Sequence, residues 1–215
     1  MKTPNSDILK KVFDADRLLR RAQGEFFTTG EDDARLDAME AAITESWSGG
    51  ADPEESTARL MRVGALLGDV GGPRACKMLL KLLDHEEPEV RLPAGESLQD
   101  LAYSRYAEVA RAIEKLIDDG KAATALSEVP YILAEIGEPG GVKLCLRLLK
   151  HPSADVVASA IESLAALGDP TAVKDLEKLR NDRRRVAADD DPEAGEIMLG
   201  DLATEAIEHL RSLDG

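Results

Sequence analysis

Few side chains in this sequence have the chemistry of a catalytic or metal-binding site. The histidines are His85, His151 and His209, and their spacing does not bring them together. The pair His85-Glu86 offers two possible iron ligands, but it is the one pair of its kind, and the sequence contains no set of four metal ligands. We therefore expect a solvated turn at His85-Glu86, with no metal site, no cofactor and no catalytic residues.

The cysteines and glycines fit structural roles better than chemical ones. Cys76 and Cys145 lack the CxxC spacing of a zinc or redox site, and each falls on the apolar face of a predicted helix. We expect both to be reduced and packed as small hydrophobic side chains. The glycine-rich stretch 64–72 lacks the Gly-Lys-Ser/Thr sequence that binds nucleotide phosphates, so it predicts a turn. The chain is accordingly not expected to be an enzyme.

The overall charge narrows the classes of partner. Of 215 residues, 42 are Asp or Glu and 27 are Lys or Arg, which gives a formal net charge of -15. Such a chain repels the phosphates of nucleic acid and favours a basic protein partner. No apolar run is long enough for a membrane span, and the polar start of the chain, MKTPNSDILKK, lacks the apolar core of a secretory signal. We expect a cytoplasmic protein.

A repeated pattern organises the chain. The segment 137–143 (GEPGGVK) recurs 31 residues later at 168–174 (GDPTAVK), and 76–81 (CKMLLK) matches 145–150 (CLRLLK) 69 residues later. The second spacing leaves room for one intermediate unit, 107–137. Internal repeats of this length are typical of solenoid proteins, in which each unit packs on its neighbours.

Each unit predicts two helices, because apolar residues recur every three or four positions between a proline and a glycine. The predicted pairs are 31–47 with 53–67, 72–84 with 88–102, 105–118 with 121–136, 139–150 with 153–167, and 170–181 with 194–212. A further helix follows the cap Asn5-Ser6-Asp7; its apolar residues are Ile8, Leu9, Val12, Phe13 and Leu19.

The fold class is therefore predicted to be all-α, a right-handed α-α superhelix of about five helical hairpins. We expect one domain over 1–215, in which 1–30 form a capping helix over the open end, 31–67 a divergent first repeat and 68–213 the regular repeats. A charged insertion at 182–193 is either a loop or a longer helix end. No strand is expected, and Pro93 and Pro130 are expected to bend the array.

Over about residues 53–213 the chain resembles HEAT-like repeat proteins of the short bacterial type, as in the repeats of phycobilin lyase subunits. The resemblance rests on the Gly-Asp/Glu-Pro turn, the Leu-Leu end of the first helix and the acidic residue followed by Val that opens the second. The family pattern continues with Arg, which Glu89-Val90-Arg91 keeps and Asp155-Val156-Val157 lacks. The resemblance implies that the second, inner helices line a concave surface and the first, outer helices a convex one.

Equivalent exposed positions differ in charge between the two kinds of helix. Two columns on the outer helices are mostly basic: Arg74, Arg111, Lys143 and Lys174, and beside them Met78, Lys115, Arg147 and Lys178. One column on the inner helices is acidic apart from a tyrosine: Glu96, Tyr131, Glu162 and Glu205, flanked by Asp100 and Glu135. Each member of the inner column lies two residues before an apolar residue, which predicts a shared direction.

These faces predict a non-catalytic scaffold or adaptor that binds a basic surface or segment of another protein. The predicted partner-binding residues are Glu96, Asp100, Tyr131, Glu135, Glu162 and Glu205. Two alternatives stay open. The resemblance to phycobilin lyase subunits implies bilin attachment, against which an aromatic content of 3% argues. The basic convex columns suggest phosphate or nucleic-acid binding, which the net charge opposes.

Overall fold

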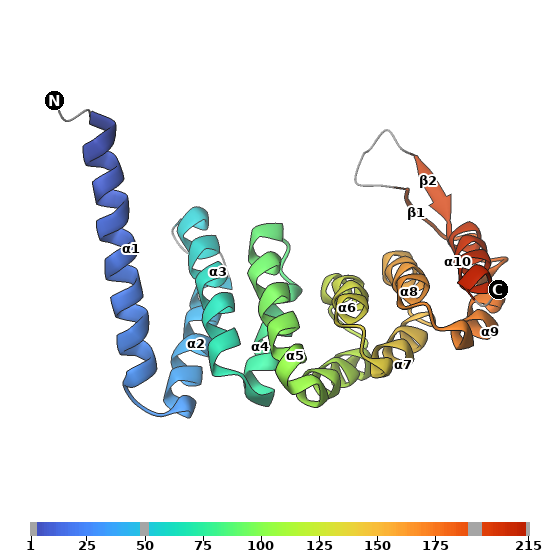
Figure 1. Cartoon of the computed structure of the whole chain (residues 1–215), viewed down its shortest axis with the longest axis horizontal. Helices are drawn as coiled ribbons and strands as arrows, with labels where there is room; N and C mark the ends of the chain where they lie inside the picture. The colour runs from blue at the N-terminus through green and yellow to red at the C-terminus, as the bar shows by residue number, and fades with distance from the viewer. Residues whose placement is uncertain (1–3, 48–51, 189–194, 214–215) are drawn as a thin grey trace.

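The computed structural model describes residues 4–47, 52–188 and 195–213. Within them the chain is a right-handed α-α superhelix, and its helices stack side by side in one curved row with the chain ends at opposite ends of the row (Figure 1). The outer helices are α2 (Asp32–Trp47), α4 (Gly72–Leu83), the second part of α5 (Pro88–Asp119), α7 (Pro139–Leu148) and α9 (Val173–Leu176). The inner helices are α3 (Pro53–Val70), the first part of α5, α6 (Ala123–Ile136), α8 (Ala154–Leu167) and α10 (Leu199–Leu213).

The core lies between the two rows of helices and follows the predicted register. The apolar residues that aligned the inner helices, Leu98, Leu133, Leu164 and Ile207, are at most 1% exposed. Leu148 on the outer helix α7 is also buried. Removing such a side chain from water contributes roughly 1.5–3 kcal/mol, so this shared layer of leucines holds neighbouring repeats together.

Glycine and proline set the limits of the helices as the repeat pattern predicts. Gly137 and Gly168 follow α6 and α8 with φ angles of 70° and 68°, in the left-handed region that ends a helix without strain. Pro139 then occupies the first turn of α7, where its missing N–H costs nothing. Before the last repeat, the Asp169 carboxylate accepts a hydrogen bond from the Thr171 backbone N–H at 2.8 Å.

Helix α5 combines two helices that the sequence predicts as separate, 88–102 and 105–118. It runs from Pro88 to Asp119, with the non-helical residue Arg105 (φ -141°, ψ 43°) at the junction. The array turns here: α2, α3 and the first part of α5 are seen from the side in Figure 1, whereas α6 and α8 are seen nearly end-on. Pro93 and Pro130, where we expect the array to bend, lie inside α5 and α6, and both helices continue through them.

The last repeat departs most from the prediction. The expected outer helix 170–181 is divided into a 3₁₀ turn (Pro170–Ala172), α9 and a second 3₁₀ turn (Glu177–Leu179), and the inner helix begins at Leu199 rather than 194. Between them β1 (Arg185–Ala187) and β2 (Glu196–Met198) form an antiparallel hairpin with Val186 opposite Ile197. The expectation of no strand is therefore wrong: Val186 is buried while its neighbours Arg185 and Ala187 are exposed. Residues 189–194 of the expected insertion lie outside the described residues.

The first helix, α1 (Pro4–Thr28), projects from the end of the row in Figure 1. The residues from which we expected a cap over the stack, Ile8, Leu9, Val12 and Phe13, are 51–60% exposed, so they do not cover the first repeat in this structure. Only the C-terminal end of the helix touches the core, through the partly buried Phe26. No helix of the described part of the chain is both long and apolar enough to cross a membrane.

Two arginines hold equivalent turns between outer and inner helices. Arg91 Nη1 donates to the carbonyls of His85 and Glu86 at 3.0 and 2.9 Å. In the unit where Val157 stands in place of this arginine, Arg184 Nη1 donates to the carbonyls of His151 and Pro152 at 3.0 and 3.1 Å. The charged insertion therefore supplies the guanidinium that the repeat itself lacks, and satisfies carbonyls beyond the end of α7.

Candidate functional site

The residues of the predicted acidic column are exposed on successive inner helices. Glu96, Tyr131, Glu162 and Glu205, here called the inner row, are exposed on α5, α6, α8 and α10, and the flanking Asp100 and Glu135 are exposed as well. The Tyr131 hydroxyl donates a hydrogen bond to Glu162 Oε2 at 2.5 Å, although the two residues are 31 positions apart. Equivalent positions of neighbouring repeats thus meet on this face, and the described carboxylates of the row form no ion pair.

A hollow of about 510 Å³ opens on this face between α5 and α6. Two inner-row residues, Glu96 and Tyr131, line it together with the apolar side chains of Leu92 and Ile132. Leu92 is 64% exposed and Tyr131 49% exposed, so the hollow offers apolar surface to a partner. Glu128 also lines the hollow, and its carboxylate lies 3.2 Å from Arg91 Nε. The other two carboxylates of the hollow, Glu89 and Glu96, form no ion pair among the described residues.

The basic columns of the outer helices are less uniform than the sequence suggests. Met78 is buried rather than exposed, at 4%. Arg74 contacts the carboxylates of Asp37 and Glu40 on α2 at 2.7 and 2.6 Å, and its hydrogen bond and charge lower the pKa of Glu40. Arg147 on α7 contacts Asp118 on α5 at 2.5 Å. Carboxylates therefore neutralise part of the columns, which counts against a strip that binds nucleic-acid phosphates.

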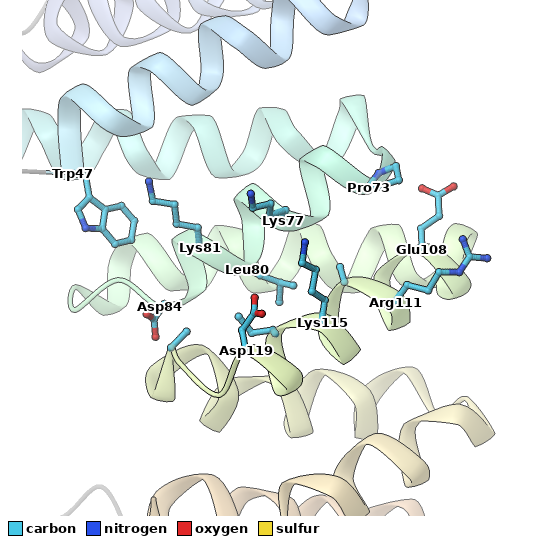
Figure 2. Close-up of a pocket in the computed structure, with 13 residues that line it drawn as sticks. Trp47, Pro73, Lys77, Leu80, Lys81, Asp84, Glu108, Arg111, Lys115 and Asp119 are labelled. Carbon is cyan, nitrogen blue, oxygen red and sulfur yellow. The ribbon is translucent and has the colours of Figure 1, made fainter. Parts of the chain in front are cut away.

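The structure also shows a groove on the outer face that the sequence did not predict. It lies between α4 and the second part of α5, beside the end of α2, with a volume of about 580 Å³. Its lining includes the apolar Trp47, Leu80 and Leu116, and Figure 2 draws basic side chains of α4 and α5 around it. These basic residues are Lys77, Lys81, Arg111 and Lys115. The available sequence signal was the spacing of four residues within two basic pairs, Lys77 with Lys81 and Arg111 with Lys115. This spacing does not reveal that the two pairs face one groove.

The histidines and cysteines have structural surroundings. His85 Nδ1 accepts a hydrogen bond from the Glu87 backbone N–H at 3.1 Å, and His151 Nδ1 accepts one from Ser153 at 3.2 Å. His85 is buried edge-on against Trp47 whereas Glu86 is exposed, so the solvated turn expected at His85-Glu86 is wrong for the histidine alone. Burial raises the pKa of the Cys145 thiol to about 12 and also raises that of Cys76. The described residues contain no cluster of three or more side chains suited to a metal ion.

Comparison with known proteins agrees with this architecture. Residues 128–189 match the family model for HEAT repeats, the region that carries the second part of α6 and all of α7, α8 and α9. No curated protein matches the chain significantly. The resemblance to phycobilin lyase subunits is not confirmed by the HEAT match.

Several solved structures with which the chain aligns are designed or engineered proteins. One engineered protein shares 18% identity, covers 89% of this chain and 96% of its own, and gives a TM-score of 0.34. A designed armadillo repeat protein shares 16% identity, covers 88% of this chain and 98% of its own, and gives a TM-score of 0.35. A structure of computationally designed armadillo repeat proteins for modular peptide recognition shares 18% identity. It covers 88% of this chain and 90% of its own, with a TM-score of 0.34. The assignment as a HEAT-like α-solenoid therefore rests on the chain's own helices and on the match at 128–189.

Proposed function

We propose that this protein is a non-catalytic scaffold that binds a basic segment of another protein on its inner-helix face. The observation that carries the proposal is the inner row, in which carboxylates of successive repeats line up and Tyr131 contacts Glu162. A helical-repeat array presents such a row over several repeats, so a partner can contact several carboxylates at once. Complementary charge then steers association and selects the partner.

The hollow between α5 and α6 supports an anchoring role for the residues around Tyr131. Leu92 and Ile132 can cover the alkyl chain of a lysine or arginine, while Glu89 and Glu96 accept hydrogen bonds from its charged end. Aromatic side chains at such positions contribute a large share of interface energy. We therefore assign Tyr131 the anchor position, with Asp100 and Glu135 extending the acidic surface on either side.

Bilin attachment, the activity that the resemblance to phycobilin lyase subunits implies, is not part of the proposal. A tetrapyrrole needs a wide stacking surface, and the aromatic residues of the two hollows, Trp47 and Tyr131, lie in different ones. Phosphate binding along the outer columns is left aside because Arg74 and Arg147 already contact carboxylates.

The test uses a fluorescent peptide of lysine and arginine residues with one central leucine. Its binding is measured by anisotropy with the wild-type protein and with the triple variant Glu96→Lys, Glu162→Lys and Glu205→Lys. We expect binding that weakens with added salt and is reduced at least about tenfold by the triple variant, because like charges then meet in the interface.

The matched control is Glu31→Lys, Glu54→Lys and Glu114→Lys, which changes the net charge equally at exposed positions outside the inner row. Similar losses in both triple variants would show that overall charge, rather than the inner row, attracts the peptide, and the proposal would then be wrong. Thermal unfolding of each variant checks that the array is intact.

A further inference from the structure

The outer groove differs from the neighbouring junctions between outer helices. At the α2–α4 junction Arg74 contacts Glu40, and at the α5–α7 junction Arg147 contacts Asp118. An arginine of one helix thus meets a carboxylate of the helix before it. At the α4–α5 junction between these two, basic residues stand on both helices, and the 580 Å³ groove lies between them.

The cations of this junction are not held in direct ion pairs, although Asp84, Glu108 and Asp119 line the same groove. Within the described residues, Lys77, Arg111 and Lys115 form no ion pair, and Lys81 Nζ instead lies 5.0 Å from the centre of the Trp47 ring. Four cations against three carboxylates leave the groove with a small excess of positive charge, which attracts an anion placed among the cations.

The floor of the groove is apolar. Trp47, Leu80, Ala112 and Leu116 line it, and they come from α2, α4 and α5. A volume of about 580 Å³ lies in the range of pockets that enclose a side chain or a small ligand. The site therefore combines an apolar hollow with a basic rim, which suits a ligand that has both an apolar group and negative charge.

We propose that this groove binds an acidic peptide segment of a partner protein, with one apolar side chain of the segment inserted beside Trp47. The carboxylates of the segment would take, at this junction, the place that Glu40 and Asp118 hold at the neighbouring ones. The inner row and the outer groove would then select partners of opposite charge, and the protein would bridge them.

The lining favours a peptide over a polyphosphate. Asp84, Glu108 and Asp119 also belong to it, and three carboxylates repel a continuous line of phosphates. A peptide carries backbone N–H groups that can donate hydrogen bonds to a carboxylate, whereas a phosphate chain carries none. Trp47 is also the only aromatic residue in the lining, which leaves successive bases of a single strand without a stacking surface.

Trp47 provides the readout, since it is the single tryptophan of the chain. The probe is an acetylated peptide of aspartate and glutamate residues with one central leucine, titrated into the full-length protein while tryptophan emission is recorded. We expect a saturable change in emission, and a loss of affinity of about tenfold or more in the double variant Lys77→Glu and Lys115→Glu. Lys81 is left unchanged because its contact with Trp47 would itself alter the emission.

The control variant is Lys143→Glu and Lys174→Glu, which reverses the same number of exposed charges on outer helices away from the groove. It should bind the acidic peptide nearly as well as the wild type. A further variant, Ala112→Phe, fills the apolar floor without changing charge and should also weaken binding.

Three outcomes would overturn the proposal: no change in Trp47 emission, an equal loss in the control variant, or tighter binding of a single-stranded oligonucleotide than of the peptide. Circular dichroism melting curves show that each variant is folded. None of these outcomes bears on the basic peptide and the inner row, so failure here leaves the proposed function separately testable.

Discussion

The outer and inner faces of this array use charged side chains in different ways. On the outer face, Arg74 and Arg147 contact carboxylates of the preceding outer helix, and these contacts join successive repeats. On the inner face, Glu96, Glu162 and Glu205 line up without ion pairs in the described part of the chain. Arg74 and Arg147 thus join successive repeats through ion pairs, whereas the proposed function assigns the carboxylates of Glu96, Glu162 and Glu205 to contacts with a partner.

The largest expected effect concerns the two sides of one inner helix. On α8, Leu164 is fully buried and Glu162, two residues earlier, is exposed. We expect Leu164→Ala to lower the free energy of unfolding by about 2–5 kcal/mol, because it leaves a cavity between repeats. Glu162→Ala should cost below about 1 kcal/mol, since it removes one exposed hydrogen bond. Urea denaturation measures both, and similar losses would mean that the inner row is part of the core.

The second prediction tests a paired charge that supports a turn. Arg184→Ala removes the donor to the carbonyls of His151 and Pro152 and the partner of Asp182, whose carboxylate lies 2.6 Å away. We expect a loss of roughly 1–3 kcal/mol in the free energy of unfolding. Arg183→Ala is the matched control, because Arg183 is exposed and should be neutral. Equal melting temperatures for the two variants would contradict the supporting role.

The third prediction compares the stability of an outer junction that has an ion pair with that of a junction that has none. Arg147→Ala breaks the contact with Asp118 and should cost roughly 0.2–1 kcal/mol, as is typical of exposed ion pairs. Lys115→Ala at the α4–α5 junction should be neutral or slightly stabilising, because it relieves repulsion from the neighbouring cations. Chemical denaturation at low salt measures the difference. A clear loss for Lys115→Ala would show that this lysine has a stabilising partner.

The smallest expected effect is a pH dependence at the same turn as Arg184. Burial and, to a smaller extent, the charge of Arg184 lower the pKa of His151 below the usual 6.5. A histidine with a lowered pKa binds fewer protons in the folded state than in the unfolded state, so stability falls as the pH drops below about 6.5. His151→Asn removes this proton uptake. Between about pH 7.5 and 5.5 the variant should lose less stability than the wild type, and equal losses would be inconsistent with this role.

The repeat register could be read from the sequence because equivalent residues have equivalent surroundings. Leu98, Leu133 and Leu164 are buried, and the inner row follows at a fixed offset from them. Contact between Tyr131 and Glu162 is what that offset predicts for adjacent repeats. Periodicity alone therefore gave the α-solenoid and the direction of the inner row.

Features that depend on contacts between different units were not predictable in the same way. The break at Arg105 lies between two correctly predicted helices, and no local signal shows that they join. Arg184 takes the role of Arg91 in the unit that has Val157 at the equivalent position, but it lies in the charged insertion, outside the repeat pattern. The outer groove needs two pairs of cations to face each other across α4 and α5, which depends on how these helices diverge.

The most direct measurement is an amide chemical-shift map of the ¹⁵N-labelled protein titrated with the basic peptide. The account predicts that the largest shifts occur at and beside Glu96, Tyr131 and Glu162, with little change around Lys143 and Arg147 on the outer helices. Shifts confined to the outer helices, with the inner row unchanged, would contradict the proposal that the inner-helix face binds a basic partner.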